Sequence, residues 1–236
     1  MNNFSLTAIV PYFNEKLTLE ESVNRLNKIK IIEKIILVDD CSIDDSKIIG
    51  QILSDKIQKI VYKKTTKNLG KGGAVLFSLT DIETSHVVIH DADLEYDPND
   101  IYEMFNINED NNSIVIGSRF LNNKTKRLQN MGLTLNLIKI FSTRLFNKIF
   151  NTSLTDIGSC YKLIPYNFLI ETTFKEKGFF LEIEFLSKSL ENGGKILEVP
   201  INYFGRSKLE GKKNNIKIMI KFYFKVLSLG FKKFKF

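Results

Sequence analysis

Five carboxylates follow an apolar run in the stretch VVIHDADLEYDPND, and their types and spacing suit a divalent cation. In an extended chain, residues two apart point the same way, so Asp91 and Asp93 can face one point, with Glu95 next in line. Oxygen ligands of this kind suit Mg²⁺ or Mn²⁺, and magnesium prefers one or two carboxylates together with substrate phosphates. The alternative is a solvated acidic turn. Because the cluster ends a buried strand, we expect Asp91, Asp93 and Glu95 to bind a metal.

The elements that would position these acids alternate between short apolar runs and helix-like segments. Strands are expected at residues 7–10, 34–38, 59–63, 86–90 and 113–117, each followed by a helical pattern or a polar turn. Buried apolar runs followed by helices indicate an α/β protein with a mostly parallel sheet flanked by helices. Such sheets bind ligands at the carboxyl ends of their strands.

Polar residues gather at all five of these strand ends. They are Pro11–Glu15, Asp39-Asp40, Gly70–Gly73, Asp91–Asp93 and Ser118-Arg119. One rim of the sheet is therefore predicted to be the functional site.

Two of these strand ends allow more than one interpretation. NLGKGG is not a P-loop, because a glycine follows Lys71 where Ser or Thr is needed; its glycines either let the backbone approach an anion or form a plain turn into a helix. Asp39 and Asp40 either cap the next helix or bind a base or ribose. Since Ser42 and Asp44 can cap that helix unaided, we expect the two earlier acids to be free for a nucleotide.

The second half of the chain has a different pattern. A basic, apolar helix is expected over residues 132–150, an acidic helix from Leu181 to Leu190, and a strand in KILEVPINYF. No repeat or Gly/Ser linker divides the chain, so residues 1–215 are predicted to form one domain, followed by a basic amphipathic helix over 216–236.

The composition fits a globular protein with an anionic partner. The 236 residues include 34 Lys and Arg against 27 Asp and Glu, a formal charge of +7. Two cysteines cannot form a disulfide framework or a thiolate zinc site, which fits a reducing compartment. The sequence shows neither a signal-peptide pattern nor an apolar stretch long enough to span a membrane, so we expect a cytoplasmic protein.

Seven motifs in order make the chain resemble the family 2 glycosyltransferases. They are AIVPYFNE, ILVDDCSIDD, NLGKGGAV, IHDADLEYDP, VIGSRF, TDIGSCYKL and VPINYFGRSKLEGKK, over roughly residues 5–215. Within that family the chain is most similar to the dolichyl-phosphate mannosyltransferase-like, or polyprenyl-phosphate glycosyltransferase, group. The resemblance implies a GT-A fold with a Rossmann-like sheet, and sugar transfer from a UDP- or GDP-sugar with inversion at the anomeric carbon.

The resemblance also implies roles for individual residues. The base and ribose would be held by Pro11, Phe13, Glu15, Val38 and Asp40. The diphosphate and its metal would be held by Asp91, Ala92 and Asp93, with Glu95 at a third metal position. Arg119 would contact a donor or acceptor phosphate, and Arg206 and Lys212 would close over the diphosphate.

The chain departs from the family pattern at two motifs. PYFNE replaces the usual PTYNE, so Phe13 lacks the hydroxyl of the usual Tyr, which concerns contacts with the base. The segment Asp156–Lys162 reads DIGSCYK in place of D-x-x-S/T-G-F-R, which concerns the acceptor side.

The expected chemistry depends on the acceptor. The leaving nucleoside diphosphate develops negative charge, which a metal together with Arg206 and Lys212 would stabilise. A polyprenyl phosphate, with a second pKa of about 6, attacks as a dianion and needs no base. A hydroxyl acceptor in polysaccharide or glycolipid synthesis would need one, and Asp156 is the candidate, its alternative role being a structural cap. We expect the lipid phosphate as acceptor.

The tail IKIMIKFYFKVLSLGFKKFKF predicts a basic amphipathic helix. Lys217, Lys221 and Lys225 lie four apart and form one stripe, with apolar residues around most of the rest. Such a helix lies in a membrane interface or packs on the domain with solvated lysines. We expect peripheral contact with the cytoplasmic membrane face, directly or through a membrane partner protein.

Other function classes fit the sequence less well. A sugar-phosphate nucleotidyltransferase would need a Gly-rich turn with Arg and Lys after the first strand, and PYFNE is not one. A non-catalytic nucleotide-binding or membrane-adaptor protein would not need Asp91, Asp93, Arg206 and Lys212 together. An acidic rim argues against a nucleic-acid partner.

Overall fold

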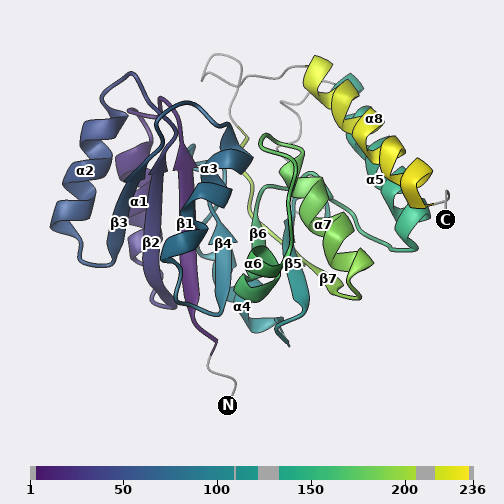
Figure 1. Ribbon diagram of the computed structural model, residues 1–236, viewed down its shortest axis with the longest axis horizontal. Coiled ribbons are helices and arrows are strands. Elements are labelled where there is room, and N and C mark those ends of the chain that lie inside the picture. Colours follow the sequence, from purple (N-terminus) through teal and green to yellow (C-terminus); the bar gives the residue numbers. More distant parts are fainter. Residues whose placement is uncertain (1–3, 109, 122–132, 206–215, 234–236) are drawn as a thin grey trace.

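The computed structural model describes residues 4–108, 110–121, 133–205 and 216–233 of the chain. Seven strands in this part form one sheet in the order β3-β2-β1-β4-β6-β5-β7 (Figure 1). They are β1 (Leu6–Tyr12), β2 (Ile32–Asp39), β3 (Ile60–Lys64), β4 (His86–Ile89), β5 (Ser113–Ser118), β6 (Lys162–Pro165) and β7 (Lys195–Pro200). Neighbouring strands are parallel, except that β6 is antiparallel to both β4 and β5. The carboxyl ends of the other strands therefore share one rim, as predicted.

The strand β6 was not predicted from the sequence. It has four residues, begins with a lysine and ends at a proline, so neither its length nor its composition marks it as a central strand. It lies between β4 and β5 and so separates two strands that follow one another in the predicted order along the chain. The sheet is thus mostly parallel, with one antiparallel strand inside it.

Helices cover both faces of the sheet. One face carries α1 (Leu19–Asn27), α2 (Ser46–Lys56) and α4 (Asp100–Asn106), and the other carries α3 (Lys71–Ser78), α6 (Tyr166–Glu171) and α7 (Leu181–Glu191), with a short 3₁₀ turn η1 (Leu79–Asp81) after α3. The two cores follow the period of two along the strands, because Ala8 and Val10 join one core while Ile9 joins the other.

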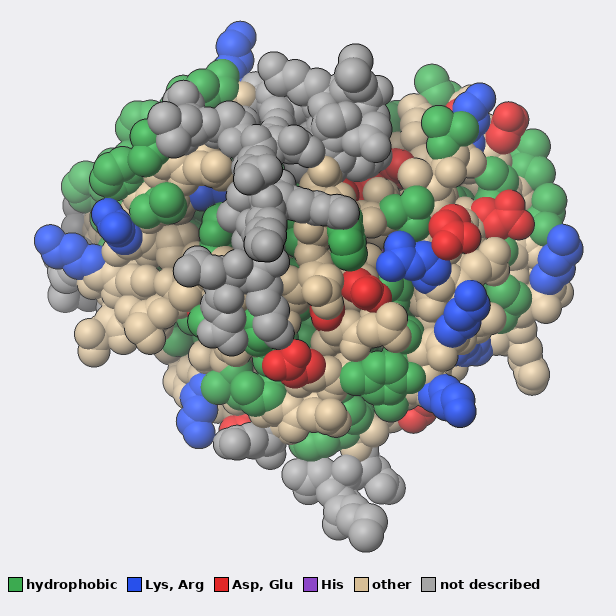
Figure 2. All heavy atoms as spheres, turned by 180° about the vertical axis from the view of Figure 1, so that it is seen from behind, with side chains coloured by type: hydrophobic (Ala, Val, Ile, Leu, Met, Phe, Trp, Pro, Cys, Tyr) green, Lys and Arg blue, Asp and Glu red, His purple; other side chains and the backbone are tan. Residues whose placement is uncertain are grey.

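The helices α5 (Leu133–Phe150) and α8 (Ile216–Lys233) lie side by side at one end of the molecule (Figure 1). Phe222 and Val226 of α8 are buried in the core that also contains α7. The predicted boundary at residue 215 stays a prediction. Figure 2 shows hydrophobic side chains gathered over this end, at the upper left of that view. Within the described residues, no helix combines the length and apolar character that a membrane span requires.

Candidate functional site

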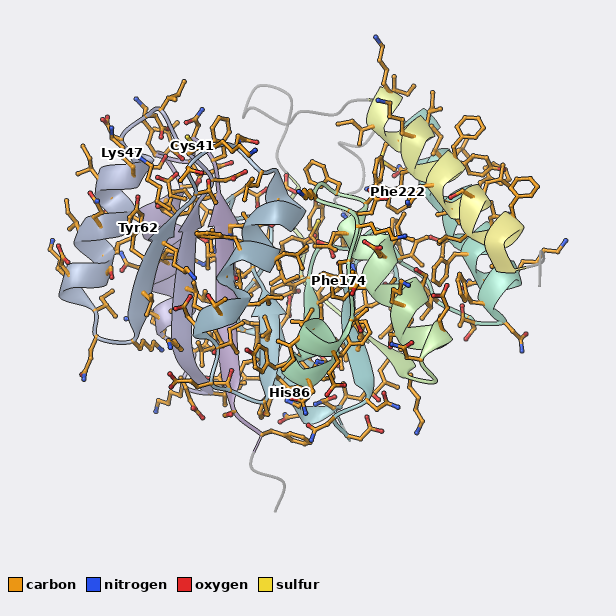
Figure 3. All side chains as sticks on the ribbon, in the orientation of Figure 1. Cys41, Lys47, Tyr62, His86, Phe174 and Phe222 are labelled. Carbon is orange, nitrogen blue, oxygen red and sulfur yellow. The ribbon has the colours of Figure 1, made fainter. Side chains whose placement is uncertain are left out.

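The loops at the carboxyl ends of β1, β2 and β4 contain strained backbone. Three of the four non-glycine residues with positive φ in the described chain lie there, namely Asn14 (57°), Cys41 (66°) and Leu94 (64°). Residues with a Cβ rarely adopt a positive φ, and those that do are often found at sites where function requires a particular backbone geometry. The first two loops are joined, since Ile43 N donates to Asn14 Oδ1 (2.9 Å). Figure 3 shows Cys41 at this rim and His86 at the opposite edge of the sheet.

The acidic loop after β4 places its carboxylates in different surroundings. Asp91 and Asp93 are partly exposed at the rim, whereas Glu95 is buried. Asp93 Oδ1 accepts a hydrogen bond from Glu95 N (3.2 Å), and the Glu95 carboxylate accepts one from the Tyr203 hydroxyl. Tyr203 also forms a β-bridge with Tyr96. The loop is therefore fixed to the segment that follows β7.

The structure does not bring the three predicted metal ligands to one point. Among the residues that the structure describes, no three His, Cys, Asp or Glu side chains form a cluster that would hold a metal ion. Asp91 and Asp93 alone still fit Mg²⁺ or Mn²⁺, because such ions accept one or two carboxylates and take their other ligands from substrate phosphates and water. Glu95 as a third ligand stays a prediction, and its Oε2 accepts the hydrogen bond from the Tyr203 hydroxyl.

Asp39 and Asp40 are not free, contrary to the expectation from the sequence. Asp39 is fully buried, and its carboxylate accepts hydrogen bonds from Ser42 N (2.7 Å) and the Tyr62 hydroxyl (3.0 Å). Asp40 is also buried and accepts from Gly70 N (2.8 Å). Both acids therefore organise the loops of the rim. A contact between Asp40 and a base or ribose stays a prediction.

The glycines of NLGKGG allow α3 to pack closely on the segment that enters α7. A Cβ on Gly72 would lie 2.8 Å from Gly178 O, too close for any side chain. Gly73 N donates to Lys177 O (2.7 Å), and the amide of Gly70 is held by an aspartate of the neighbouring loop. Because these amides already have acceptors within the protein, the structure favours the turn into a helix over an anion cradle.

Four alternating charges run from the rim into the core, and we call them the charge chain: Asp91, Lys71, Glu182 and Lys162. Lys71 Nζ lies 2.5 Å from Asp91 Oδ1 and 3.5 Å from Glu182 Oε1, and Lys162 Nζ lies 2.9 Å from Glu182 Oε2. Burial alone would lower the pKa of Lys71, but the negative charges of Asp91 and Glu182 outweigh it and hold this pKa well above its usual value. Lys71 is therefore a fixed cation beside the acidic loop.

Arg119 and Asp156 form a buried ion pair beside the end of β5. Arg119 Nε and Nη2 donate to the two carboxylate oxygens at 2.7 and 2.8 Å, and Arg119 N donates at 3.1 Å. Burial would raise the pKa of Asp156, but Arg119 outweighs it and holds this pKa below its usual value. A weakly basic carboxylate enclosed in an ion pair is poorly suited to remove a proton from a hydroxyl. The structure therefore argues against Asp156 as the base.

Glu198 of β7 holds the backbone next to this ion pair. Its carboxylate accepts hydrogen bonds from Asp156 N (2.9 Å) and from Thr155 N (2.7 Å). Burial, the largest effect, raises the pKa of Glu198. The three bonds that Arg119 donates to Asp156, and the bonds that Glu198 accepts from Thr155 N and Asp156 N, fix the start of the Asp156–Lys162 segment. The role of Asp156 in the structure is therefore to position this segment and Arg119.

The residues expected to hold the base and ribose divide by burial. Pro11, Val38 and Ala92 are buried. Phe13 is 38% exposed, and Glu15 is half-buried with its carboxylate accepting from the Thr18 hydroxyl (2.9 Å). The structure thus leaves the Phe13 ring available for a ligand at the rim. Contacts of these residues with a nucleotide stay a prediction.

Some site residues lie outside the described part of the chain, and others were missed. Arg206 and Lys212, expected to close over the diphosphate, are outside the described residues. Sequence reasoning missed Glu182, Glu198 and Tyr203, which hold Lys71, Asp156 and Glu95. Glu198 and Tyr203 interrupt the apolar run KILEVPINYF, which suggests a buried partner without identifying it, whereas Glu182 lies among other charged residues of an acidic helix and gives no such signal.

Comparison with known proteins identifies the family. The profile of the family described as Glycosyl transferase family 2 matches residues 7–169. Dolichol-phosphate mannosyltransferase from Pyrococcus furiosus is 28% identical over 216 residues, which cover 88% of this chain and 60% of that protein. The chain thus spans about 60% of the length of this relative.

Solved structures share the fold. Glucosyl-3-phosphoglycerate synthase from Mycobacterium tuberculosis, in complex with UDP, superposes with a TM-score of 0.72 at 15% identity, over 98% of this chain and 80% of that one. A mannosyltransferase from Pyrobaculum calidifontis, in complex with GDP-Man and Mn²⁺, gives 0.60 at 16% identity, over 84% and 56%. The fold is therefore GT-A, as the resemblance implied.

Proposed function

The chain belongs to glycosyl transferase family 2, and we propose that it transfers a sugar from a nucleotide-diphosphate sugar to a polyprenyl phosphate, with inversion. The observation that carries the choice of acceptor is the Arg119–Asp156 ion pair. A hydroxyl acceptor requires a general base, and the expected base, Asp156, is bound to Arg119 in this ion pair. A phosphate acceptor requires none, because its second pKa of about 6 leaves it a dianion at neutral pH.

The proposed reaction is a single displacement. A phosphate oxygen of the acceptor attacks the anomeric carbon from the face opposite the leaving group, and the bond from that carbon to the donor diphosphate breaks. The electron pair leaves with the nucleoside diphosphate, so no proton has to move. Asp91 and Asp93 would hold Mg²⁺ or Mn²⁺, which would stabilise the charge that develops on the leaving diphosphate. The Mn²⁺ in the Pyrobaculum calidifontis complex supports the use of a divalent cation.

The surface of α5 and α8 supports a lipid acceptor. Exposed apolar side chains gather on both helices (Figure 2): Leu137, Ile140, Phe141, Ile216, Ile220, Phe224 and Phe231. A groove of about 250 Å³ between the helices is lined by Ile138, Phe141, Ile220 and Tyr223. Lys217 and Lys221 of α8 are exposed beside this surface. An apolar patch next to lysines suits an anionic membrane surface, so we propose that the protein contacts the membrane here, directly or through a membrane partner.

The test is transfer to a defined acceptor. The purified chain is incubated with Mn²⁺, vesicles containing polyprenyl phosphate, and each of a set of UDP- and GDP-sugars, and the lipid is analysed by mass spectrometry. We expect a lipid-linked sugar phosphate from one donor, and none from vesicles containing the polyprenol without phosphate. Sugar transferred to a water-soluble hydroxyl or to phosphoglycerate, with none on the lipid, would refute the proposed acceptor.

The donor site is tested separately by calorimetry. UDP and GDP are titrated into the chain with Mn²⁺ and with EDTA, and into the Asp93→Ala variant. We expect one nucleotide to bind only with the metal, and the variant to lose this binding. Binding of neither nucleotide under any condition would contradict the transferase proposal itself.

A further inference from the structure

The exposure of the side chains in the charge chain decreases from the rim into the core. The side chain of Asp91 is 20% exposed, that of Lys71 13%, that of Glu182 5% and that of Lys162 0%. Two cations and two anions alternate along it, so each inner charge has an opposite charge on either side. Only the outermost member, Asp91, is also a proposed metal ligand. The charge chain therefore connects the proposed metal site to a buried ion pair.

Lys71 stands at a position that local structure disfavours. It is the first residue of α3, where the positive end of the helix dipole repels a cation. Its side chain is largely buried, and burial of an ammonium group is costly without anionic partners. A residue that conflicts with its local context is expected where function requires it. Asp91 and Glu182 supply the compensating charge at this position.

The backbone prevents Lys71 from moving far from Glu182. The beginning of α3 is pressed against the entry to α7, where Gly72 meets Gly178 O and Gly73 N donates to Lys177 O. Glu182 is in turn held by Lys162, which is fully buried on the central strand β6. The Lys71 ammonium can therefore leave Asp91 by rotation of its side chain while it remains beside the acidic loop.

We propose that Lys71 is the resident counter-ion of Asp91, that the divalent cation displaces it from this carboxylate, and that Glu182 and Lys162 keep Lys71 beside the site to meet the donor diphosphate. This inference rests on the proposed function, in that it takes Asp91 as a metal ligand. Before the donor arrives, Lys71 competes with the metal for Asp91. Once the diphosphate is present, the same ammonium group adds positive charge beside it. Lys71 thus opposes binding of the bare metal and favours binding of the metal–nucleotide complex.

Opposite effects on two affinities provide the test. Binding of Mn²⁺ alone is followed by electron paramagnetic resonance of the free ion, and binding of UDP or GDP at saturating Mn²⁺ by calorimetry. For Lys71→Met we expect Mn²⁺ alone to bind roughly tenfold more tightly and the nucleotide to bind roughly tenfold more weakly, since couplings of this kind are typically 5- to 150-fold. Lys71→Arg keeps the positive charge, so both its affinity for Mn²⁺ alone and its affinity for the nucleotide should stay close to those of the wild type.

The matched control is Lys63→Met. Lys63 also pairs with an aspartate, Asp81 of η1, which follows the C-terminal end of α3, whereas Lys71 begins that helix at the rim, so its loss should change neither affinity. Glu182→Gln should weaken nucleotide binding in the same direction as Lys71→Met, because it releases the ammonium from its place. Thermal unfolding of each variant establishes that the fold is retained. If Glu182→Gln does not fold, the comparison of Lys71→Met with Lys71→Arg still tests the proposal.

Two results would overturn the proposal. One is Mn²⁺ binding by Lys71→Met that is unchanged or weaker than in the wild type, which would make Lys71 a support for Asp91 and not its competitor. The other is nucleotide binding by the wild type that is unaffected by EDTA, which would remove the metal from Asp91. Neither result touches sugar transfer to the lipid, whose absence would instead contradict the proposed function.

Discussion

Replacing Asp156 by Asn separates the two roles that this residue can have. The substitution keeps the shape of the side chain. In the wild type, two carboxylate oxygens of Asp156 accept hydrogen bonds from Nε, Nη2 and the backbone amide of Arg119, whereas asparagine offers one side-chain oxygen. The amide nitrogen that replaces the other oxygen is a donor and would face a donor of Arg119. The Arg119 guanidinium, 5% exposed, would then lose the carboxylate that neutralises it.

The expected cost follows from this burial. Removing one partner of a buried ion pair typically lowers the free energy of unfolding by about 3–5 kcal/mol, because the remaining charge is uncompensated. If Asp156 were instead a general base, the main effect would be a fall in the rate of transfer of about 10²–10⁴-fold with little loss of stability. Urea unfolding and initial rates of transfer to polyprenyl phosphate, measured on the same preparations, separate these cases.

The control is Asp81→Asn, which breaks the more exposed pair with Lys63. Its aspartate side chain is 39% exposed, so we expect a loss within about 1 kcal/mol, as for surface ion pairs. The positioning role of Asp156 is refuted if Asp156→Asn unfolds within about 1 kcal/mol of the wild type while its rate falls at least about a hundredfold.

Three further outcomes are expected. Burial lowers the pKa of both His86 and His90 to about 4, so below pH 6.5 the unfolded chain binds more protons than the folded one. The free energy of unfolding, measured with urea, should therefore fall between pH 7 and pH 5 by about 2 kcal/mol for each histidine. Gly72→Ala should destabilise by about 1–3 kcal/mol because its Cβ would lie 2.8 Å from Gly178 O, whereas Gly178→Ala, with open space around its Cβ, should change little in the same assay. Phe224→Glu, at a side chain 60% exposed, should retain thermal stability but lose sedimentation with anionic vesicles; retained sedimentation would contradict the membrane surface on α8.

The fold and the location of the site follow from local sequence patterns. An apolar run buried on both faces is recognisable by itself, and the polar residues after it mark the strand end, so Pro11, Asp40, Asp91 and Arg119 could be placed on one rim. The short strand β6 has no such pattern, because its four residues include a lysine whose charge is neutralised by Glu182, which is distant in sequence.

The partners of the charged residues could not be predicted in the same way. Lys71 and Asp91 are separated by twenty positions, and Arg119 and Asp156 by thirty-seven, so only the packing of α3, β4 and β5 brings them together. The sequence predicts that buried charges have partners, but it does not select among the carboxylates of the rim. The expectation that Asp39 and Asp40 are free was wrong for this reason.

Exposure sorts the acids of the rim in a way that residue type does not. Asp39, Asp40 and Asp156 are at most 3% exposed, and each accepts hydrogen bonds that hold a loop or an arginine in place. Asp91 and Asp93 are partly exposed. A metal that arrives with a diphosphate can reach only carboxylates at the surface of the rim. The buried acids therefore build the site while the DxD pair meets the ligand, and substitution of a buried acid should affect stability as well as activity, whereas Asp93→Ala should affect ligand binding with little loss of stability.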